Sequence, residues 1–252
     1  ITNNSSLQGG GGIAIWQNSN PTLNDIIISG NSALNSGGGM YISHSDPILE
    51  HVIISGNTSE IWGGGIFIND SSNPILSHVT ISGNSADNYG GGGIKCMDNA
   101  NPSLVNCILW NNSPQEVDFI NYTNTDPNSI TIAYSDVQGG EEAIITNGMN
   151  TVNWLYGNID TDPLFVDPAN GDYNLTNLSP CIDAGDPESE YDPDGTIADM
   201  GALYYQQDQD AYGCTDPDAC NYNPAANVDN GSCVYPECSG ECYGEVTISN
   251  QW

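Results

Sequence analysis

Apolar and polar residues alternate with a period of two along short stretches of the first 110 residues. Ile13 and Ile15 flank Ala14, and the same alternation surrounds Tyr41 and Phe67 further on. A period of two places successive side chains on opposite faces of a β-strand, so each stretch predicts a short strand with one inward face. Gly, Asn and Pro interrupt these stretches too often for helices, and we expect an all-β chain.

The predicted strands belong to a repeat of about 27 residues. A triple glycine followed by an apolar residue begins at Gly10, Gly37, Gly63 and Gly91, in steps of 27, 26 and 28 residues. One such unit cannot bury its apolar face alone, whereas stacked units pair each strand with the coil above and the coil below. The repeat therefore predicts a parallel β-helix, a solenoid with about 27 residues per coil, over residues 1–205.

A Ser-Gly-Asn triplet closes the units, at Ser29, Ser55 and Ser82. Asparagine tolerates left-handed backbone geometry, so we expect it at a tight corner. Stacked asparagines can also form a ladder of side-chain hydrogen bonds. The triple glycines allow a further tight turn without side-chain crowding.

These motifs resemble those of the right-handed parallel β-helix family, the pectate-lyase-like superfamily, in its bacterial surface-protein branch. The repeated Gly-Gly-Gly-Ile and Ser-Gly-Asn motifs are similar to those of polymorphic outer-membrane-type repeat proteins. The segments 162–168, 171–175, 179–187 and 199–202 look like the closing coils of such proteins. The resemblance covers residues 1–205 and implies the fold, but it says almost nothing about chemistry.

Residues 206–252 have a different composition. The runs 213–224 (GCTDPDACNYNP) and 229–233 (DNGSC) are similar to a small Cys-rich module common in secreted bacterial surface proteins. That resemblance implies a linker or anchor-proximal module. We expect a Cys-rich acidic module over residues 206–243 and a C-terminal strand over residues 244–252. This strand can be donated to a neighbouring subunit.

The net charge of the chain limits the classes of partner that it can bind. The chain has 32 acidic residues and a single basic residue, Lys95, for a net charge of −31, and 25 of the acidic residues lie beyond residue 110. Such a surface repels nucleic acid and anionic lipid. No apolar run approaches the roughly 20 residues of a membrane helix. The chain begins at Ile1 without a signal sequence, so we expect a mature form or a fragment.

Eight cysteines in this composition favour disulfides and an extracellular or cell-surface location. Cys96 and Cys107 fall in inward columns, where they form either a disulfide across the core or buried thiols. Cys181 either pairs with the tail or stays free. We expect most of the tail cysteines to be oxidised, with the connectivity open and one partner outside this odd-numbered set: Cys214, Cys220, Cys233, Cys238 and Cys242. Zinc is the weaker alternative, since paired CxxC units are absent.

The residues argue against an enzyme. Pectate-type lyases typically use an arginine base, and the chain has none. Lys95 falls in the outward column of Tyr41 and Phe67, where we expect a solvated side chain. A glycosidase needs two converging carboxylates, and the paired Asp, Gly-His-Gly and Arg-x-Lys pattern of polygalacturonases is missing.

Acidic clusters predict calcium as the one cofactor, because Ca²⁺ prefers several carboxylate and carbonyl oxygens in flexible loops. The candidate ligands are Asp192, Asp194, Asp199, Asp208, Asp210, Asp216 and Asp218. The alternative is a solvated acidic surface. His51 and His78 share one column, which predicts either a metal site or a polar strand edge.

We expect a structural protein of the cell surface, either a self-assembling filament subunit or an adhesin stalk. The alternative is a carbohydrate-binding or carbohydrate-processing β-helix, with outward aromatic residues as a sugar platform: Tyr41, Trp62, Phe67 and Tyr89. The filament hypothesis rests on the chain ends. Residues 1–5 align with the strand at 28–32, and residues 246–250 nearly repeat residues 79–84. Strand addition then predicts a head-to-tail homopolymer through Ile1, Asn4, Val246, Ile248 and Trp252.

Overall fold

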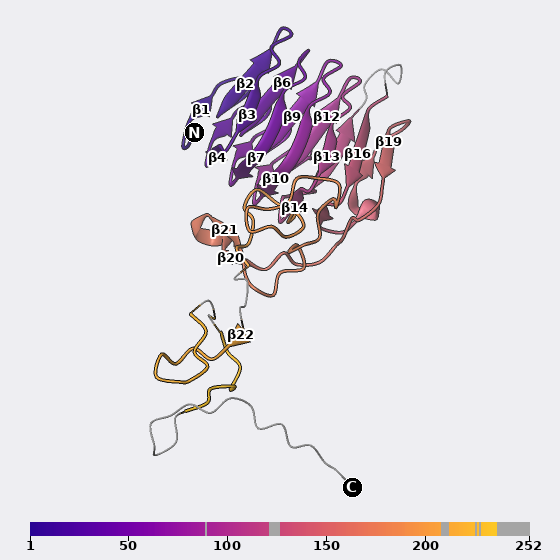
Figure 1. The fold of residues 1–252 in the computed structure, drawn as a ribbon. Helices are drawn as coiled ribbons and strands as arrows, with labels where there is room; N and C mark the ends of the chain where they lie inside the picture. The colour runs from indigo at the N-terminus through magenta and orange to yellow at the C-terminus, as the bar shows by residue number, and fades with distance from the viewer. Residues whose placement is uncertain (89, 121–126, 208–211, 225, 227, 236–252) are drawn as a thin grey trace. The chain divides into compact units, whose positions relative to one another are not determined.

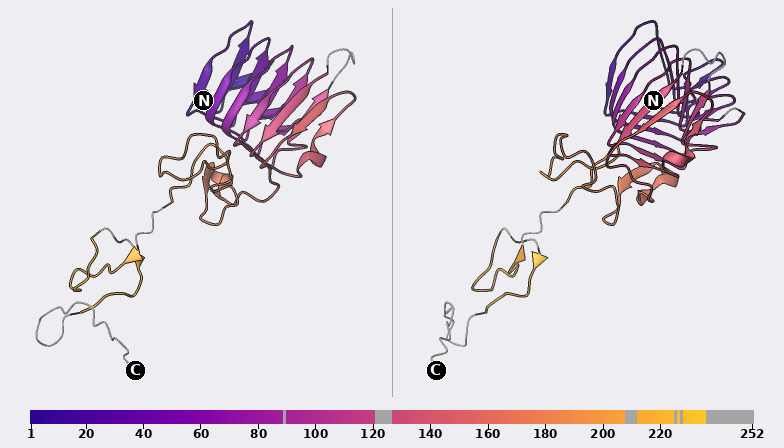
Figure 2. Two further views of the ribbon diagram at one scale, coloured as in Figure 1. Left: turned by 45° about the vertical axis from the view of Figure 1, so that its right-hand side comes forward. Right: turned by 90° about the vertical axis from the view of Figure 1, so that its right-hand side faces the viewer.

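A computed structural model describes residues 1–88, 90–120, 127–207, 212–224, 226 and 228–235 of the chain. The chain divides into two compact units, Ile1–Tyr205 and Gln206–Trp252. The first unit is a parallel β-helix whose coils follow one another from β1 to β19 (Figures 1 and 2). The all-β parallel solenoid expected from the repeat is confirmed.

Three parallel sheets form the sides of the solenoid. The six-stranded sheet contains β2 (Ile13–Trp16), β6 (Met40–Ser43), β9 (Ile66–Asn69), β12 (Ile94–Met97), β15 (Val117–Ile120) and β18 (Ile145–Thr146). The four-stranded sheet contains β1 (Ser5–Ser6), β5 (Ser32–Ala33), β8 (Thr58–Ser59) and β11 (Ser85–Ala86). The nine-stranded sheet contains β3 (Thr22–Asn24), β4 (Ile27–Ser29), β7 (Ile48–Ser55), β10 (Ile75–Ser82), β13 (Ser103–Val105), β14 (Ile108–Trp110), β16 (Ser129–Ala133), β17 (Asp136–Val137) and β19 (Thr151–Trp154).

The register of the paired strands matches the alignment of the sequence repeats. Leu49 pairs with Leu76, and Leu76 pairs with Leu104 on the next coil. Val52 and Val79 form another inward column, and both are fully buried. Identical residue types therefore stack along the axis, which fills the core of the solenoid coil by coil.

The corner after each Ser-Gly-Asn triplet differs in detail from the expectation. The left-handed residue is the glycine, with φ of 65° at Gly30, 59° at Gly56 and 65° at Gly83. The following asparagines form the expected ladder instead. The backbone N–H and the side-chain Nδ2 of Asn57 both donate to Oδ1 of Asn84, each at 2.9 Å. Glycine takes the strained position because it has no Cβ to clash there.

The nine-stranded sheet bends where one column takes left-handed backbone geometry. His51 and His78 have φ of 53° and 51° in the middle of β7 and β10. Asp25 and Asn106 have the same geometry on the neighbouring coils. The bend turns each long strand onto a second facet, and this column marks the corner.

Residues 163–205, the returning segment, fold back over the outer face of the nine-stranded sheet. They do not stack as the closing coils that the resemblance implied. β20 (Phe165–Asp167) and β21 (Asp172–Leu175) pair antiparallel around a short 3-10 helix, η2 (Pro168–Asn170). The backbone N–H of Ala202 donates to Oγ1 of Thr80 at 2.9 Å. Thr80 is therefore outward from the solenoid, as its column predicts, yet it is buried.

The second unit has little regular structure among its described residues. β22 (Tyr212–Gly213) pairs in parallel with β23 (Val228–Asp229). A disulfide joins Cys214 to Cys233, with the Cα atoms 4.7 Å apart. Cys220 is also disulfide-bonded, whereas Cys238 and Cys242 lie outside the described residues.

Candidate functional site

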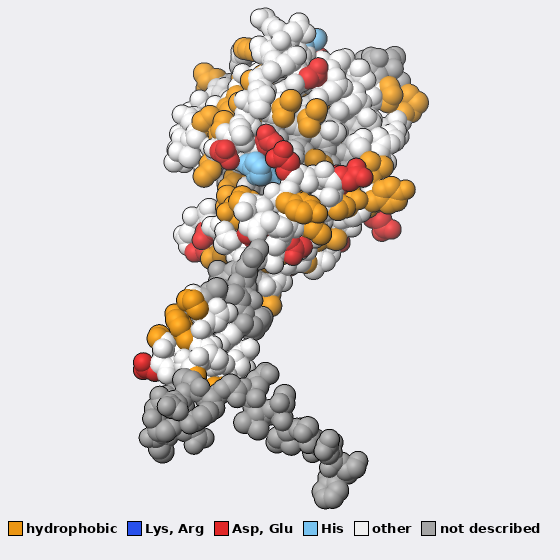
Figure 3. All heavy atoms as spheres, in the orientation of Figure 1, with side chains coloured by type: hydrophobic (Ala, Val, Ile, Leu, Met, Phe, Trp, Pro, Cys, Tyr) orange, Lys and Arg blue, Asp and Glu red, His pale blue; other side chains and the backbone are white. Residues whose placement is uncertain are grey.

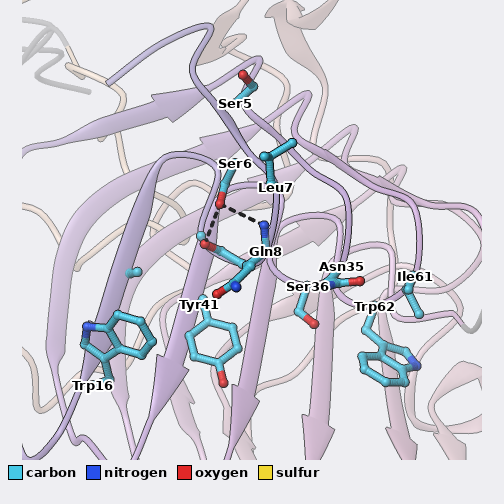
Figure 4. A pocket seen from close by; sticks show the side chains of 13 residues that line it. Ser5, Ser6, Leu7, Gln8, Trp16, Asn35, Ser36, Tyr41, Ile61 and Trp62 are labelled. Carbon is cyan, nitrogen blue, oxygen red and sulfur yellow. Dashed lines mark hydrogen bonds between the residues drawn. The ribbon is translucent and has the colours of Figure 1, made fainter.

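A hollow of about 890 Å³ lies on the first three coils. We call it the aromatic groove. Its aromatic lining residues are Trp16 at the end of β2, Tyr41 in β6 and Trp62 just before Gly63. Figure 4 shows these three rings across neighbouring coils, with Gln8, Asn35 and Ser36 beside them. The groove therefore joins flat apolar surfaces to hydroxyl and amide groups.

Packing fixes the rings of the aromatic groove. Tyr41 stacks on Phe67 with ring centroids 5.7 Å apart, and Trp62 stacks on Phe67 at 5.8 Å. Trp16 meets Tyr41 edge to face at 6.3 Å. Gly9 lies so close beneath Tyr41 that a Cβ there would come within 2.7 Å of the ring. The aromatic surface is consequently held in place before any ligand arrives.

The rim of the aromatic groove is set by a short turn. Ser6 Oγ donates to the carbonyl of Gly9 at 3.1 Å and accepts from the backbone N–H of Gln8 at 3.2 Å (Figure 4). This turn carries Leu7 and Gln8 over the edge of the hollow. None of the described lining residues is Asp, Glu, Lys, Arg or His. The groove is therefore uncharged on a chain of net charge −31.

The structure changes the membership of the predicted sugar platform. Phe67 points outward from its strand, but Trp62 covers it and leaves it only 1% exposed. Tyr89 lies outside the described residues. Trp16 was missed by the sequence reading, although it is 55% exposed. Its place one residue after the inward Ile15 was the signal that could have found it.

The solvated position expected for Lys95 is wrong. Lys95 lies one coil beyond Phe67 in the same outward column, and it is only 1% exposed. Its Nζ forms an ion pair with Oδ2 of Asp118, the residue directly opposite on the next coil. Burial raises the pKa of Asp118, although the ion pair opposes that shift. The alternation predicted the direction of the side chain correctly, but not that neighbouring residues cover it.

The first acidic cluster lies in the returning segment. Oδ2 of Asp192 accepts the backbone N–H of Asp199 at 3.0 Å, and Oδ1 of Asp199 accepts that of Asp183 at 2.7 Å. Oδ1 of Asp194 accepts both the N–H and the hydroxyl of Thr196. Burial and then repulsion from Asp199 raise the pKa of Asp192 to about 6. These carboxylates organise the loop backbone.

The second acidic cluster is only partly described, since Asp208 and Asp210 lie outside the described residues. Asp216 accepts the backbone N–H of Asp218 at 2.9 Å and the hydroxyl of Tyr235 at 2.7 Å. Across the described residues, no three His, Cys, Asp or Glu side chains converge as metal ligands. Calcium binding stays a prediction.

The two column histidines stack as the alignment implies, with ring centroids 4.8 Å apart. Asn106 Nδ2 contacts Nε2 of His78 at 3.0 Å, and Ser77 Oγ contacts its Nδ1 at 3.1 Å. Burial and then repulsion from His51 lower the pKa of His78 to about 4. On the face shown in Figure 3, acidic side chains gather near the histidines. The arrangement fits the polar strand edge.

Cys96 and Cys107 are both buried free thiols, which decides between the two sequence alternatives. Burial raises the pKa of the Cys107 thiol to about 12 and raises that of Cys96 as well. Cys181 is also buried and free, and its Sγ lies 3.4 Å from Oδ2 of Asp136. None of the three reaches the aromatic groove.

The predicted assembly residues are divided between the first coil and the undescribed tail. The amino group of Ile1 donates to the carbonyl of Ile27 at 2.7 Å, and Asn4 Nδ2 donates to Oδ1 of Asn31 at 3.0 Å. Val246, Ile248 and Trp252 lie outside the described residues. Head-to-tail assembly stays a prediction.

Comparison with known proteins places the fold in a family. No helix among the described residues is long and apolar enough to cross a bilayer. No curated protein and no solved structure matches the chain. The sequence model of the family described as the right-handed β-helix region matches residues 1–159. That match covers more than half of the 252 residues, and the chain belongs to the right-handed β-helix family.

Proposed function

We propose that this chain is an extracellular adhesive solenoid that binds an uncharged oligosaccharide in the aromatic groove without cleaving it. The observation that carries the proposal is the row formed by Trp16, Tyr41 and Trp62 beside hydroxyl and amide groups. Sugar rings present apolar C–H faces and a rim of hydroxyls. An aromatic face covers the first, while Ser, Asn and Gln side chains satisfy the second.

The charge of the groove selects the class of glycan. A uronate-containing polymer would bring carboxylates toward a chain of net charge −31, whose only lysine is buried in an ion pair. An uncharged glycan meets no such repulsion. Coils are about 4.8 Å apart along the axis, close to the length of one sugar unit, so a linear glycan can run across successive coils.

Two further features support binding without cleavage and a location at the cell surface. Hydrolysis of a glycoside uses a pair of carboxyl groups, and the described lining residues supply none. The Cys214–Cys233 disulfide suits an oxidising compartment outside the cytosol. A solenoid whose coils pair throughout would hold the groove on a stiff support.

The test is calorimetric titration of the full chain with cellohexaose, mannohexaose and hexagalacturonate. We expect one of the uncharged hexasaccharides to bind and the uronate to give no heat. Trp16→Ala and Tyr41→Ala each remove a stacking face and should raise Kd about tenfold, which corresponds to a loss of about 1.4 kcal/mol in binding free energy. Tyr191→Ala is the matched control, because Tyr191 is exposed and lies outside the groove.

Chromatography of the same mixtures separates binding from cleavage. Intact hexasaccharide after prolonged incubation agrees with the proposal, and shorter products would favour a carbohydrate-processing enzyme. Equal binding by Trp16→Ala, Tyr41→Ala and the unchanged chain would contradict the assignment of the groove.

A further inference from the structure

The last coil of the solenoid ends in an open strand edge. β19 pairs with β16 and with no other strand among the described residues. The N–H of Thr151 donates to Asn128 and that of Leu155 to Ile132, at 3.0 and 2.8 Å. Backbone groups alternate in direction along a parallel strand. Val152 and Trp154 therefore direct their N–H and C=O groups away from β16, toward the open edge.

Apolar side chains accompany this edge. Val152 and Trp154 continue the inward columns of Ile130 and Ile132, which are fully buried, but they are themselves only half-buried. Nearby on the same coil, Met149 is 60% and Tyr156 83% exposed. An edge strand with unpaired backbone and exposed apolar side chains is a template for pairing with another chain.

The distribution of charge indicates which kind of chain pairs with this edge. Residues 143–157 contain no Asp, Glu, Lys, Arg or His, although they lie in the part of the chain beyond residue 110 that carries 25 of the 32 acidic residues. A cationic partner finds no counter-charge on this stretch. A second copy brings the same neutral stretch, so the contact itself opposes no like charges, and it also brings a matching apolar edge.

We propose that β19 pairs antiparallel with β19 of a second copy, centred on Asn153, to form an end-to-end dimer. In this register Val152 of each copy lies opposite Trp154 of the other, and each of these two pairs exchanges both N–H···O=C hydrogen bonds. The edge is thus self-complementary, as a two-fold interface requires. The contact also covers the half-buried Val152 and Trp154 side chains.

Salt should strengthen the dimer. Glu141 and Glu142 in the 3-10 helix η1 (Glu141–Ala143) and Asp160 border the neutral stretch. Two copies bring these carboxylates toward one another, and added salt screens their repulsion. We expect the dimer Kd to fall as NaCl rises from 20 to 500 mM.

Sedimentation equilibrium of the full chain tests the interface. Met149→Glu and Tyr156→Glu place a charge on the edge and should weaken dimerisation at least tenfold without changing the melting temperature. Leu178→Glu is the matched control, because Leu178 is 77% exposed outside this coil. A chain that stays monomeric at high concentration and high salt would overturn the proposal, as would a dimer that all three variants leave intact.

A cysteine placed at the two-fold axis tests the register. Opposed residues at a non-hydrogen-bonded antiparallel position have Cα atoms about 4.5 Å apart, within the range that a disulfide spans. Asn153→Cys should therefore form an intermolecular disulfide on mild oxidation. Thr131→Cys, in the same outward column one coil back, should not. Cross-linking by neither variant, or equally by both, would refute the antiparallel pairing.

Discussion

The ammonium group of Lys95 is buried in the wall of the solenoid and has the carboxylate of Asp118 as its counter-charge. Removing two charges from water is costly, and their attraction offsets that cost only while both remain. Asp118 Oδ1 also accepts a hydrogen bond from Asn147 Nδ2 at 3.2 Å. The ion pair and this hydrogen bond therefore connect side chains from three successive coils.

Lys95→Met should lower the free energy of unfolding by about 3–5 kcal/mol, because it leaves the Asp118 carboxylate buried without its cation. Urea unfolding at pH 7, followed by circular dichroism, measures this change. The double variant Lys95→Met/Asp118→Asn should recover most of the loss, since no buried charge remains and the acceptor for Asn147 is kept. A double variant no more stable than the single one would show that the ion pair itself is stabilising.

Sequence alternation predicts the direction of a side chain, and this sets the limit of residue-level prediction here. It placed Lys95 and Phe67 correctly in an outward column. Outward from a strand is not the same as exposed, however, because a corner residue such as Trp62 can fold over the sheet. No periodic pattern encodes such cover, so alternation alone does not separate an exposed outward side chain from a buried one.

The asparagine ladder stabilises each coil against the next. Asn57 is fully buried, donates to Asn84 and to the carbonyl of Ile28, and accepts from Asn31. Its loss would remove the acceptor of the buried backbone N–H of Asn31, whose Nδ2 keeps only its bond to the carbonyl of Ile1. Buried donors without partners are costly, each by about 1–3 kcal/mol.

Asn57→Ala should therefore reduce the free energy of unfolding by about 2–4 kcal/mol. Asn73→Ala is the comparison, since Asn73 makes similar contacts to Asp46 and Asn101 on an exposed ladder. Water can replace those contacts, and we expect a loss below about 1 kcal/mol. Thermal and urea unfolding of both variants give the two values. Similar losses for the two would contradict a special role for the buried ladder.

At the level of strands, the sequence predicts the structural features that recur in every coil. The register of β7 on β10 and the asparagine ladder both follow from residue identity at a fixed spacing. The third side of the solenoid was not predicted, because β1, β5, β8 and β11 have only two residues each and no apolar alternation. Backbone pairing with adjacent coils alone extends these strands, and that signal is not in the side chains.

Buried carboxyls give the whole molecule a pH-dependent stability. Burial raises the pKa of Glu116 to about 7, and it does the same for Asp136. A raised pKa means that the folded state holds its proton more tightly than the unfolded state. The contribution of these groups is therefore fully present below about pH 4 and is lost as the pH rises through about 7. His78, whose pKa is lowered to about 4, has the opposite effect as the pH falls.

Glu116→Gln should remove part of this dependence. Between pH 4.5 and 7 the unchanged chain should lose about 2–3 kcal/mol of stability through Glu116, while the variant should lack that loss. Urea unfolding at half-unit pH steps measures the two slopes. Glu142→Gln, an exposed change in η1, is the control and should follow the unchanged chain. Equal slopes for all three would refute a buried, proton-binding Glu116.

The returning segment is the part of the whole molecule that sequence reasoning did not place. Its motifs resembled closing coils, yet Tyr173 and Ala202 pack on Ile53 across the outer face. Contacts between residues so far apart in the sequence do not follow the repeat spacing. Once the chain leaves the 27-residue period, its sequence pattern no longer predicts which residues it contacts. The same holds for the rim of the aromatic groove, where the turn at Ser6 brings Gly9 against the ring of Tyr41.

The bond between Ala202 and Thr80 has a consequence for the order in which the protein folds. It joins residues 122 positions apart, whereas ladder bonds join residues 26 to 28 apart. Closing the longer loop costs about 1.3 kcal/mol more in chain entropy if it precedes the coils. Once the solenoid has formed, that distance is already bridged. Folding should thus advance coil by coil as the chain is synthesised, with the returning segment docking last over Ile53 and Ile108, which stay open to chaperones until then.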